Sequence, residues 1–208
     1  ETKMEKPEKY QKKYTNADYY KEGKFQAEVA LNAVLDMFDY YGIPYTEYLK
    51  KNMFITDFEL GDFENVGMAG VFFVNDSTYR YFGHDIYLLP GQMIAEHYHL
   101  PTANFPAKHE SWLLRHGNCA SFGIGEPTAN NFAIPASQKD FVTVADHSQE
   151  IELGNWVPLA QLESRHFLLA GDQGAIVTEF GTYHDNAGLN FTNPKVVFTD
   201  ILTELRNK

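Results

Sequence analysis

The sequence predicts a mostly β protein, a sandwich or barrel of short strands behind an N-terminal helical segment. Short runs of β-branched and aromatic residues, separated by turn residues, recur from residue 57 onward. The chain has 208 residues, 44% of them hydrophobic, which is enough for one substantial core. Its 16 phenylalanines and 13 tyrosines favour the same fold class, because aromatic rings pack well on pleated surfaces.

The N-terminal part is predicted to comprise an arm and a helix, over residues 1–56. Residues 1–24 are polar and basic without an apolar period, which predicts an arm that either lies on the domain or is partly disordered. Residues 26–41 carry apolar side chains at helical spacing, and Gly42 and Pro44 stop this helix. A second short helix is expected over residues 45–51.

Residues 57–208 are predicted to form the barrel, with no further domain boundary. A hairpin signal, Asn75-Asp76-Ser77, separates the first two strands. The expected strands are GMAGVFFVN (67–75), TYRYFGHDIYLLP (78–90), GQMIAEHYH (91–99), ESWLLRHG (110–117), ASFGIG (120–125), DFVTVAD (140–146), QEIELGN (149–155), HFLLAGD (166–172) and GAIVTEFG (174–181).

The net negative charge of the chain argues against anionic partners. The 28 acidic and 17 basic residues give a net charge of -11, which opposes binding to nucleic acid or to an anionic membrane. No stretch approaches the run of about 20 apolar residues that a membrane helix needs. We therefore expect a small neutral ligand or a cation as partner, and a cytoplasmic protein. Export with a removed signal peptide is the alternative, because the chain as given begins with Glu1.

Two histidines, one residue apart, start a candidate metal site. In a strand, His97 and His99 point to the same face, so their imidazoles lie side by side. With Gly91 before them and Glu110 and Gly117 after them, they read G-x5-H-x-H and E-x6-G. This spacing resembles the first motif of the cupin superfamily. The resemblance implies a cupin double-stranded β-helix, or jelly-roll, barrel.

The cupin resemblance also implies a fourth ligand. A second motif is expected to supply one histidine from a later strand, and His166 in SRHFLLAGDQGA is the candidate. The residues before it, PLAQLESRH, lack the customary Pro-x-Gly, and ten residues separate His99 from Glu110, so LPTANFPAKH is expected to loop out. Three imidazoles and a carboxylate suit manganese, zinc, iron, cobalt or nickel, whereas calcium and magnesium prefer more oxygen ligands.

A longer series of motifs narrows the family. EHYH, then K-x-E-S-W-x-x-R-x-G over residues 108–117, EIELG, RHFLLAGDQGAIVTEF and HDNAGLNFTNP resemble the D-lyxose isomerases in order and spacing. The resemblance implies a manganese-dependent enzyme that interconverts D-lyxose and D-xylulose, or D-mannose and D-fructose, and works as a homodimer. It implies metal ligation by His97, His99, Glu110 and His166.

Four further residues are predicted around the substrate. Lys108, two residues before Glu110, would face the same cavity and bind a sugar oxygen or carry a hydroxyl proton. Glu179 is the expected catalytic base, on the face that it shares with Val177. His184 and Asp185 lie in a loop rich in Gly and Asn, which could close over the sugar or could simply be a turn. The hydrogen could move through an enediolate or as a hydride, and the sequence leaves both routes open.

Simpler interpretations apply to several residues. The sequence predicts surface or hydrogen-bonded roles for His84, His109, His116 and His147, and a core position for Trp112. His84, in an upstream strand, could also lie near the cavity, although no motif supports this. Lys108 and Glu179 could equally be a surface lysine and a structural carboxylate. An iron-dependent dioxygenase, a sugar-phosphate isomerase or a non-catalytic sugar-binding cupin would keep the same metal ligands. A phosphate site would need clustered basic side chains, which this acidic chain offers only sparsely near the motifs.

Overall fold

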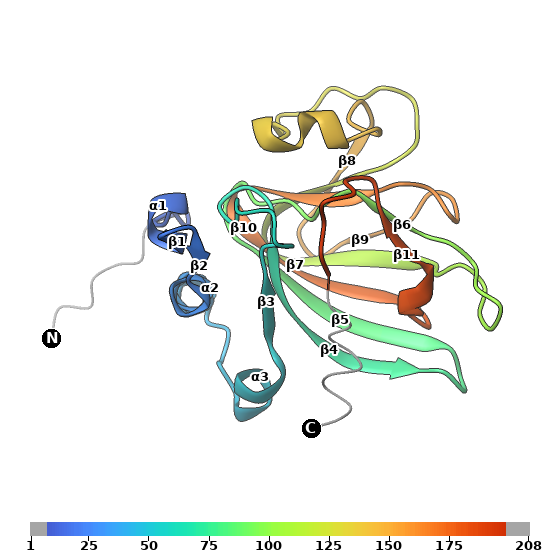
Figure 1. Ribbon diagram of the computed structural model, residues 1–208, viewed down its shortest axis with the longest axis horizontal. Helices are drawn as coiled ribbons and strands as arrows, with labels where there is room; N and C mark the ends of the chain where they lie inside the picture. Colours follow the sequence, from blue (N-terminus) through green and yellow to red (C-terminus); the bar gives the residue numbers. More distant parts are fainter. Residues whose placement is uncertain (1–7, 199–208) are drawn as a thin grey trace, which may run out of the picture.

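The computed structural model describes residues 8–198 and shows a β barrel with helices packed on one outer face (Figure 1). The large sheet is antiparallel and has the order β3-β4-β5-β10-β7-β8, with β9 also paired to β7. Its strands are β3 (Phe54–Thr56), β4 (Met68–Asp76), β5 (Tyr81–Leu88), β7 (Glu110–Phe122), β8 (Ser148–Ile151), β9 (Trp156–Pro158) and β10 (Phe167–Thr182). A second sheet pairs β6 (His97–His99) with β11 (Leu189–Phe191). The predicted mostly β fold class is confirmed.

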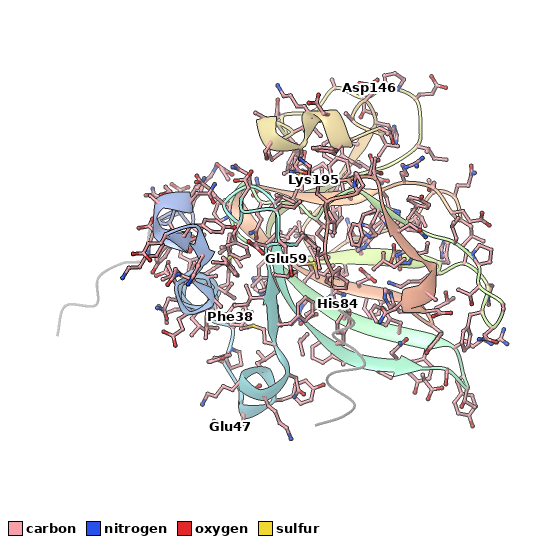
Figure 2. All side chains as sticks on the ribbon, in the orientation of Figure 1. Phe38, Glu47, Glu59, His84, Asp146 and Lys195 are labelled. Carbon is pink, nitrogen blue, oxygen red and sulfur yellow. The ribbon has the colours of Figure 1, made fainter. Side chains whose placement is uncertain are left out.

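The N-terminal helices follow the predicted pattern. Helix α2 (Ala27–Tyr41) ends at Gly42, whose φ of 72° is the left-handed conformation that glycine adopts at little cost. Its apolar stripe, which includes Phe38, packs on the outer face of the large sheet against Tyr87 (Figure 2). Helix α3 (Glu47–Asn52) begins at Thr46, whose hydroxyl accepts a hydrogen bond from Leu49 N at 3.3 Å.

The described part of the N-terminal arm lies on the domain. It contains the short helix α1 (Asn16–Tyr19) and a hairpin of β1 (Tyr20–Lys21) with β2 (Lys24–Phe25). Tyr10 and Tyr19 are buried in the same core as α2. These aromatic side chains supply the apolar contacts that the basic composition of the segment concealed. Residues 1–7 of the predicted arm lie outside the described residues.

The strand predictions are correct in place but differ in length. ESWLLRHG and ASFGIG form one strand, β7, and HFLLAGD and GAIVTEFG form one strand, β10. GQMIAEHYH is extended as a strand only in β6. The prediction for DFVTVAD is wrong, because a 3-10 helix (Ala136–Phe141) precedes a loop whose Thr143 and Val144 N–H groups donate to the carboxylate of Glu96 instead of to a neighbouring strand.

The barrel interior positions the site. Alternation along β10 directs Ala175, Val177 and Glu179 inward, and the paired strands direct His84 and Trp112 to the same side. The main apolar core lies inside the barrel, and several of its residues, including Phe58, Ile86 and Leu168, also line a cavity that contains the polar side chains of the site. No helix within residues 8–198 is long and apolar enough to cross a membrane.

Candidate metal centre and active site

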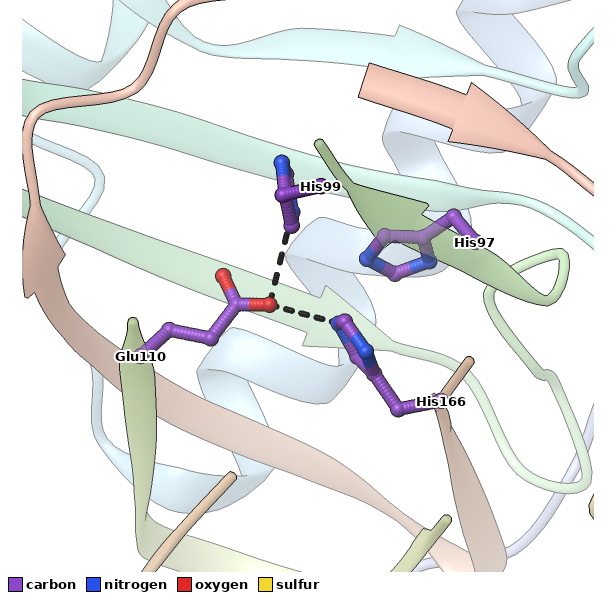
Figure 3. A group of neighbouring side chains, drawn as sticks. All are labelled: His97, His99, Glu110 and His166. Carbon is purple, nitrogen blue, oxygen red and sulfur yellow. Dashed lines mark ion pairs between the residues drawn. The ribbon is translucent and has the colours of Figure 1, made fainter. Parts of the chain in front are cut away.

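Four side chains predicted as metal ligands lie together inside the barrel. The ligand atoms of His97, His99, Glu110 and His166 all fall within 4.8 Å of one another (Figure 3). Strand β6 supplies the first two, the start of β7 supplies Glu110, and His166 immediately precedes β10. The ten residues between β6 and β7 loop out, as their number predicted, and return the chain to the same end of the barrel.

Backbone carbonyls orient two of the imidazoles. The Nδ1 atom of His97 lies 2.9 Å from Ala95 O, and that of His166 lies 2.9 Å from Ser164 O. A carbonyl oxygen can only accept a hydrogen bond, so each Nδ1 carries the proton. Each Nε2 is then left with a lone pair, which is the arrangement that a histidine needs to ligate an ion.

The buried donor set fits a cation. Glu110 Oε1 and His166 Nε2 lie 2.5 Å apart, yet neither has a hydrogen-bond partner within the described residues. Burial lowers the pKa of His166, but Glu110 reverses this effect and raises it. The two atoms thus need a positive charge between them, which a proton on Nε2 or a bound cation in its place would supply. Nitrogen and carboxylate ligands of this kind suit a first-row divalent ion. The four residues can therefore hold such an ion.

Lys108 joins the metal cluster to a second carboxylate. Its Nζ lies 2.6 Å from Glu110 Oε2 and also donates to Glu179 Oε1. The ammonium lies 4.1 Å above the ring of Phe82, which gives it a cation-π contact as well. Burial opposes the charge of Lys108, but the two carboxylates overcome this effect and raise its pKa. Lys108 is thus a fixed positive charge beside the cluster.

The two carboxylates differ in their affinity for a proton. Burial opposes ionisation of Glu110, but Lys108, His99 and His166 reverse this effect and hold the pKa of Glu110 well below its usual range. Burial raises the pKa of Glu179 to about 7, because Lys108 only partly offsets it and the charge of Glu110 adds to it. One carboxylate is suited to ligation, and the other to accepting and returning a proton near neutral pH.

Of the two residues predicted in the loop after β10, His184 lines the cavity and Asp185 does not. His184 lines the cavity; its Nε2 lies 2.6 Å from Asn186 Oδ1, and its ring is 5.4 Å from that of His99. Its Nδ1 has no partner within residues 8–198. Asp185 is not part of the cavity lining, because its carboxylate instead accepts from the Thr102 hydroxyl at 2.8 Å. The structure thus brings His184 to the site and leaves Asp185 behind it.

His84 lies in the wall of the cavity, the second of the two positions that the sequence left open for it, and not at the surface. It is only 4% exposed, lines the cavity and has an unpartnered Nε2 in the described part of the chain, so it is not a surface histidine. Burial, with Lys108 nearby, lowers its pKa well below the usual range and keeps the ring neutral. Strand alternation could have identified it, because His84 shares the inward face with Phe82 and Ile86.

Comparison with known proteins identifies the relatives. No family model matches the chain. It is 33% identical over 147 residues to a D-lyxose/D-mannose isomerase of Thermosediminibacter oceani, an alignment that spans 71% of this chain and 80% of that protein. It is 31% identical over 168 residues to a D-lyxose ketol-isomerase of Cohnella laeviribosi, which covers 80% of this chain and 90% of that protein.

Solved structures share the fold at lower identity. The L-ribose isomerase of Cellulomonas parahominis with L-psicose superposes with a TM-score of 0.59 at 14% identity, over 79% of this chain and 90% of that one. The L-ribose isomerase of Acinetobacter sp. DL28 with L-ribose gives 0.59 at 12% identity, over 80% and 91%. These superpositions show that the two L-ribose isomerases share the fold of this chain. Because its relatives of 31–33% identity, aligned over most of both chains, are D-lyxose isomerases, the chain belongs to the D-lyxose isomerase family and is an aldose-ketose sugar isomerase.

Proposed function

We propose that the protein is a metal-dependent isomerase that interconverts D-lyxose and D-xylulose, with D-mannose and D-fructose as a second pair. One observation carries this proposal: a cavity lined by a three-histidine, one-glutamate cluster also contains a separate carboxylate, Glu179, held by Lys108. The names of the relatives, D-lyxose/D-mannose isomerase and D-lyxose ketol-isomerase, support this choice of substrate.

The proposed ligands are His97, His99, Glu110 and His166, and the proposed ion is manganese, with zinc, iron, cobalt or nickel as alternatives. When bound, a divalent ion supplies Lewis acidity, which polarises the sugar carbonyl and stabilises negative charge on the adjacent oxygen. These four side chains would hold the ion at the wall of the cavity in which the sugar would bind.

Glu179 is the proposed catalytic base. It would take the proton from C2 of the open-chain aldose and return it to C1, so the hydrogen lost by one carbon is gained by the other. Its raised pKa, about 7, suits both halves of this exchange. In a hydride shift, the alternative, Glu179 would only orient the sugar.

Lys108 and His184 are the proposed substrate-binding groups. The hydroxyl proton must move from O2 to O1 as the carbonyl changes position, and the ammonium of Lys108 can donate to either oxygen. His184 offers its unpartnered Nδ1 to a sugar hydroxyl. Asp185 supports this loop through Thr102, so we assign it an indirect role in binding.

A phosphorylated sugar fits the cavity less well. Lys108 is the one lysine or arginine in the cavity lining within residues 8–198, and two carboxylates already hold it. A phosphate group would need further cationic partners. Neutral sugars are therefore the better proposal than sugar phosphates.

We also propose a homodimer. Tyr81 and Phe180 lie on the outer face of the large sheet, away from the cavity, and are 50% and 49% exposed. A second copy could cover aromatic groups of this size. Size-exclusion chromatography with multi-angle light scattering distinguishes a dimer from a monomer of 23.8 kDa.

Proton NMR of D-lyxose in D2O, with manganese-loaded and chelator-stripped protein side by side, tests the function. We expect D-xylulose only with the loaded protein, and D-mannose should be tested in parallel. Deuterium at C1 of the product supports proton transfer through Glu179, while its absence supports the hydride shift. If neither sugar is converted although bound metal is measured, the proposed substrates are wrong.

A further inference from the structure

The register of the large sheet places Glu179 between two inward-facing neighbours. On β5, His84 is its cross-strand partner, and on β7 the partner is Trp112. All three side chains are nearly inaccessible to solvent, with exposed fractions of 6%, 4% and 2%. Directly opposite residues on one sheet face are close enough for their side chains to interact. The carboxylate is therefore enclosed by residues from both adjacent strands.

The two oxygens of Glu179 have different donors. Lys108 donates to Oε1, whereas the indole N–H of Trp112 donates to Oε2 at 3.3 Å. An ammonium withdraws more electron density from its acceptor than a neutral N–H does, so Oε2 is the more basic oxygen. The same indole ring lies 5.5 Å from the ring of His166. Trp112 thus connects the proposed base to the metal cluster.

His84 lies on the other side of Oε2. Its Nδ1 is 3.9 Å from that oxygen, too far for a hydrogen bond, so the ring borders the carboxylate without pairing with it. The ring of Phe72 lies 4.4 Å away and restrains the imidazole. Gly70 provides the space for it, because a Cβ atom at that position would lie 2.8 Å from His84 Nε2.

We propose that Trp112 and His84 are positioning residues that direct Glu179 Oε2 toward the substrate as the proton-accepting atom. The inference rests on the proposed role of Glu179 as base. Trp112 fixes the oxygen through its N–H, and His84 prevents the carboxylate from turning away. Neither residue exchanges a proton with the sugar.

Kinetics of matched variants test the proposal. Trp112→Phe removes the indole N–H and keeps an aromatic ring against His166. Trp156→Phe, the same change at an exposed tryptophan, is the control. We expect kcat to fall about tenfold or more in Trp112→Phe, with KM within about twofold, because misplacing a catalytic group slows the reaction more than it weakens binding. Metal content, measured by mass spectrometry, should match the wild type.

A second pair of variants tests His84. His84→Leu removes the polar ring, whereas His84→Asn places an amide near the position of Nδ1. We expect His84→Leu to lower kcat about tenfold and His84→Asn to recover part of the loss, again with full metal content. Equal kcat in wild type, Trp112→Phe and His84→Leu would overturn the proposal.

The Trp112 contact can also be measured without turnover. The chain has 2 tryptophans, so an NMR spectrum of 15N-labelled, Zn2+-loaded protein shows two indole N–H signals, and Trp156→Phe assigns them. Glu179→Gln should shift the Trp112 signal and leave that of Trp156 in place. An unshifted Trp112 signal would overturn the hydrogen bond, even if Trp112→Phe does not fold.

The role of Glu179 can be tested separately from the roles of its two neighbours. If Glu179→Gln retains wild-type turnover, Glu179 is not the base, and Trp112 and His84 then have no base to position. If Glu179→Gln loses turnover while Trp112→Phe and His84→Leu retain kcat, only the positioning roles are wrong.

Discussion

His97 and His166 exchange both of their backbone hydrogen bonds, from His97 N to His166 O at 3.0 Å and from His166 N to His97 O at 2.9 Å. Their rings consequently lie 4.4 Å apart between centroids. Two of the four proposed ligands, far apart in sequence, are thus joined through the main chain. Main-chain pairing therefore fixes the positions of these two side chains relative to each other.

Removal of metal should leave the fold intact. The core around the cluster is apolar and continuous, so far-UV circular dichroism of chelator-treated protein should match that of the loaded protein. The melting temperature should fall, because an ion that binds only the folded state at 100 times its dissociation constant adds about 2.7 kcal/mol. Unfolding on chelation at 25 °C would contradict a preformed site.

Loss of one ligand should remove the ion without removing the fold. His97→Ala deletes an imidazole whose Nδ1 is already held by Ala95 O, and we expect metal affinity and turnover to fall together, the affinity by about tenfold or more. His116→Ala, at a position outside the cluster, is the control. Normal metal content in His97→Ala would refute its role as a ligand.

The sequence predicted which side chains gather in the cluster better than it predicted their surroundings. Strand alternation, a local rule, predicted that His97 and His99 share a face, whereas Glu110 and His166 were expected from the resemblance to the cupin motifs. His166 lacked the usual Pro-x-Gly signal, and only its long-range pairing with His97 explains its position. Alternation places His84 on the inward face of β5, but its neighbours Phe72 and Glu179 depend on which strands lie beside β5, which the sequence did not reveal.

Glu179→Gln should abolish turnover and retain the metal. The amide has nearly the same size but cannot accept a proton, so kcat should fall about 10²- to 10⁴-fold, the usual contribution of a general base. Metal content and melting temperature serve as readouts of the fold, and Glu150→Gln, at an exposed site, as the control. Undiminished turnover would remove Glu179 from the mechanism and favour a hydride shift.

Gly117→Ala should destabilise the barrel more than Gly154→Ala. Both glycines have φ of 81°, but a Cβ atom at Gly117 would lie 2.0 Å from Gly174 O, whereas nothing lies within 4 Å at Gly154. The left-handed conformation alone costs about 1–2 kcal/mol, which is the expected loss for Gly154→Ala in urea unfolding. Gly117→Ala adds a backbone clash to this cost. Equal losses would show that the two strands separate easily at this point.

Glu96 should control the loop that follows the 3-10 helix. Its buried carboxylate accepts hydrogen bonds from Thr143 N at 2.7 Å, Val144 N at 3.1 Å and the Thr192 hydroxyl at 2.6 Å. Glu96→Ala would leave these donors without their acceptor, at about 1–3 kcal/mol for each one that stays buried. The loop escapes this cost by opening to water, so trypsin should cleave after Lys139 faster than in the wild type.

Glu96→Ala should affect the loop and leave metal binding unchanged. Glu96 precedes His97 in the chain, but its carboxylate points toward the loop and is not one of the clustered ligand atoms. We therefore expect Glu96→Ala to bind metal with the wild-type stoichiometry while it becomes sensitive to trypsin. Glu150→Ala, at an exposed position on β8, should change neither property. Unchanged cleavage after Lys139 in Glu96→Ala would mean that the loop is held by its apolar contacts, Val142 and Val144 against the core, rather than by the carboxylate.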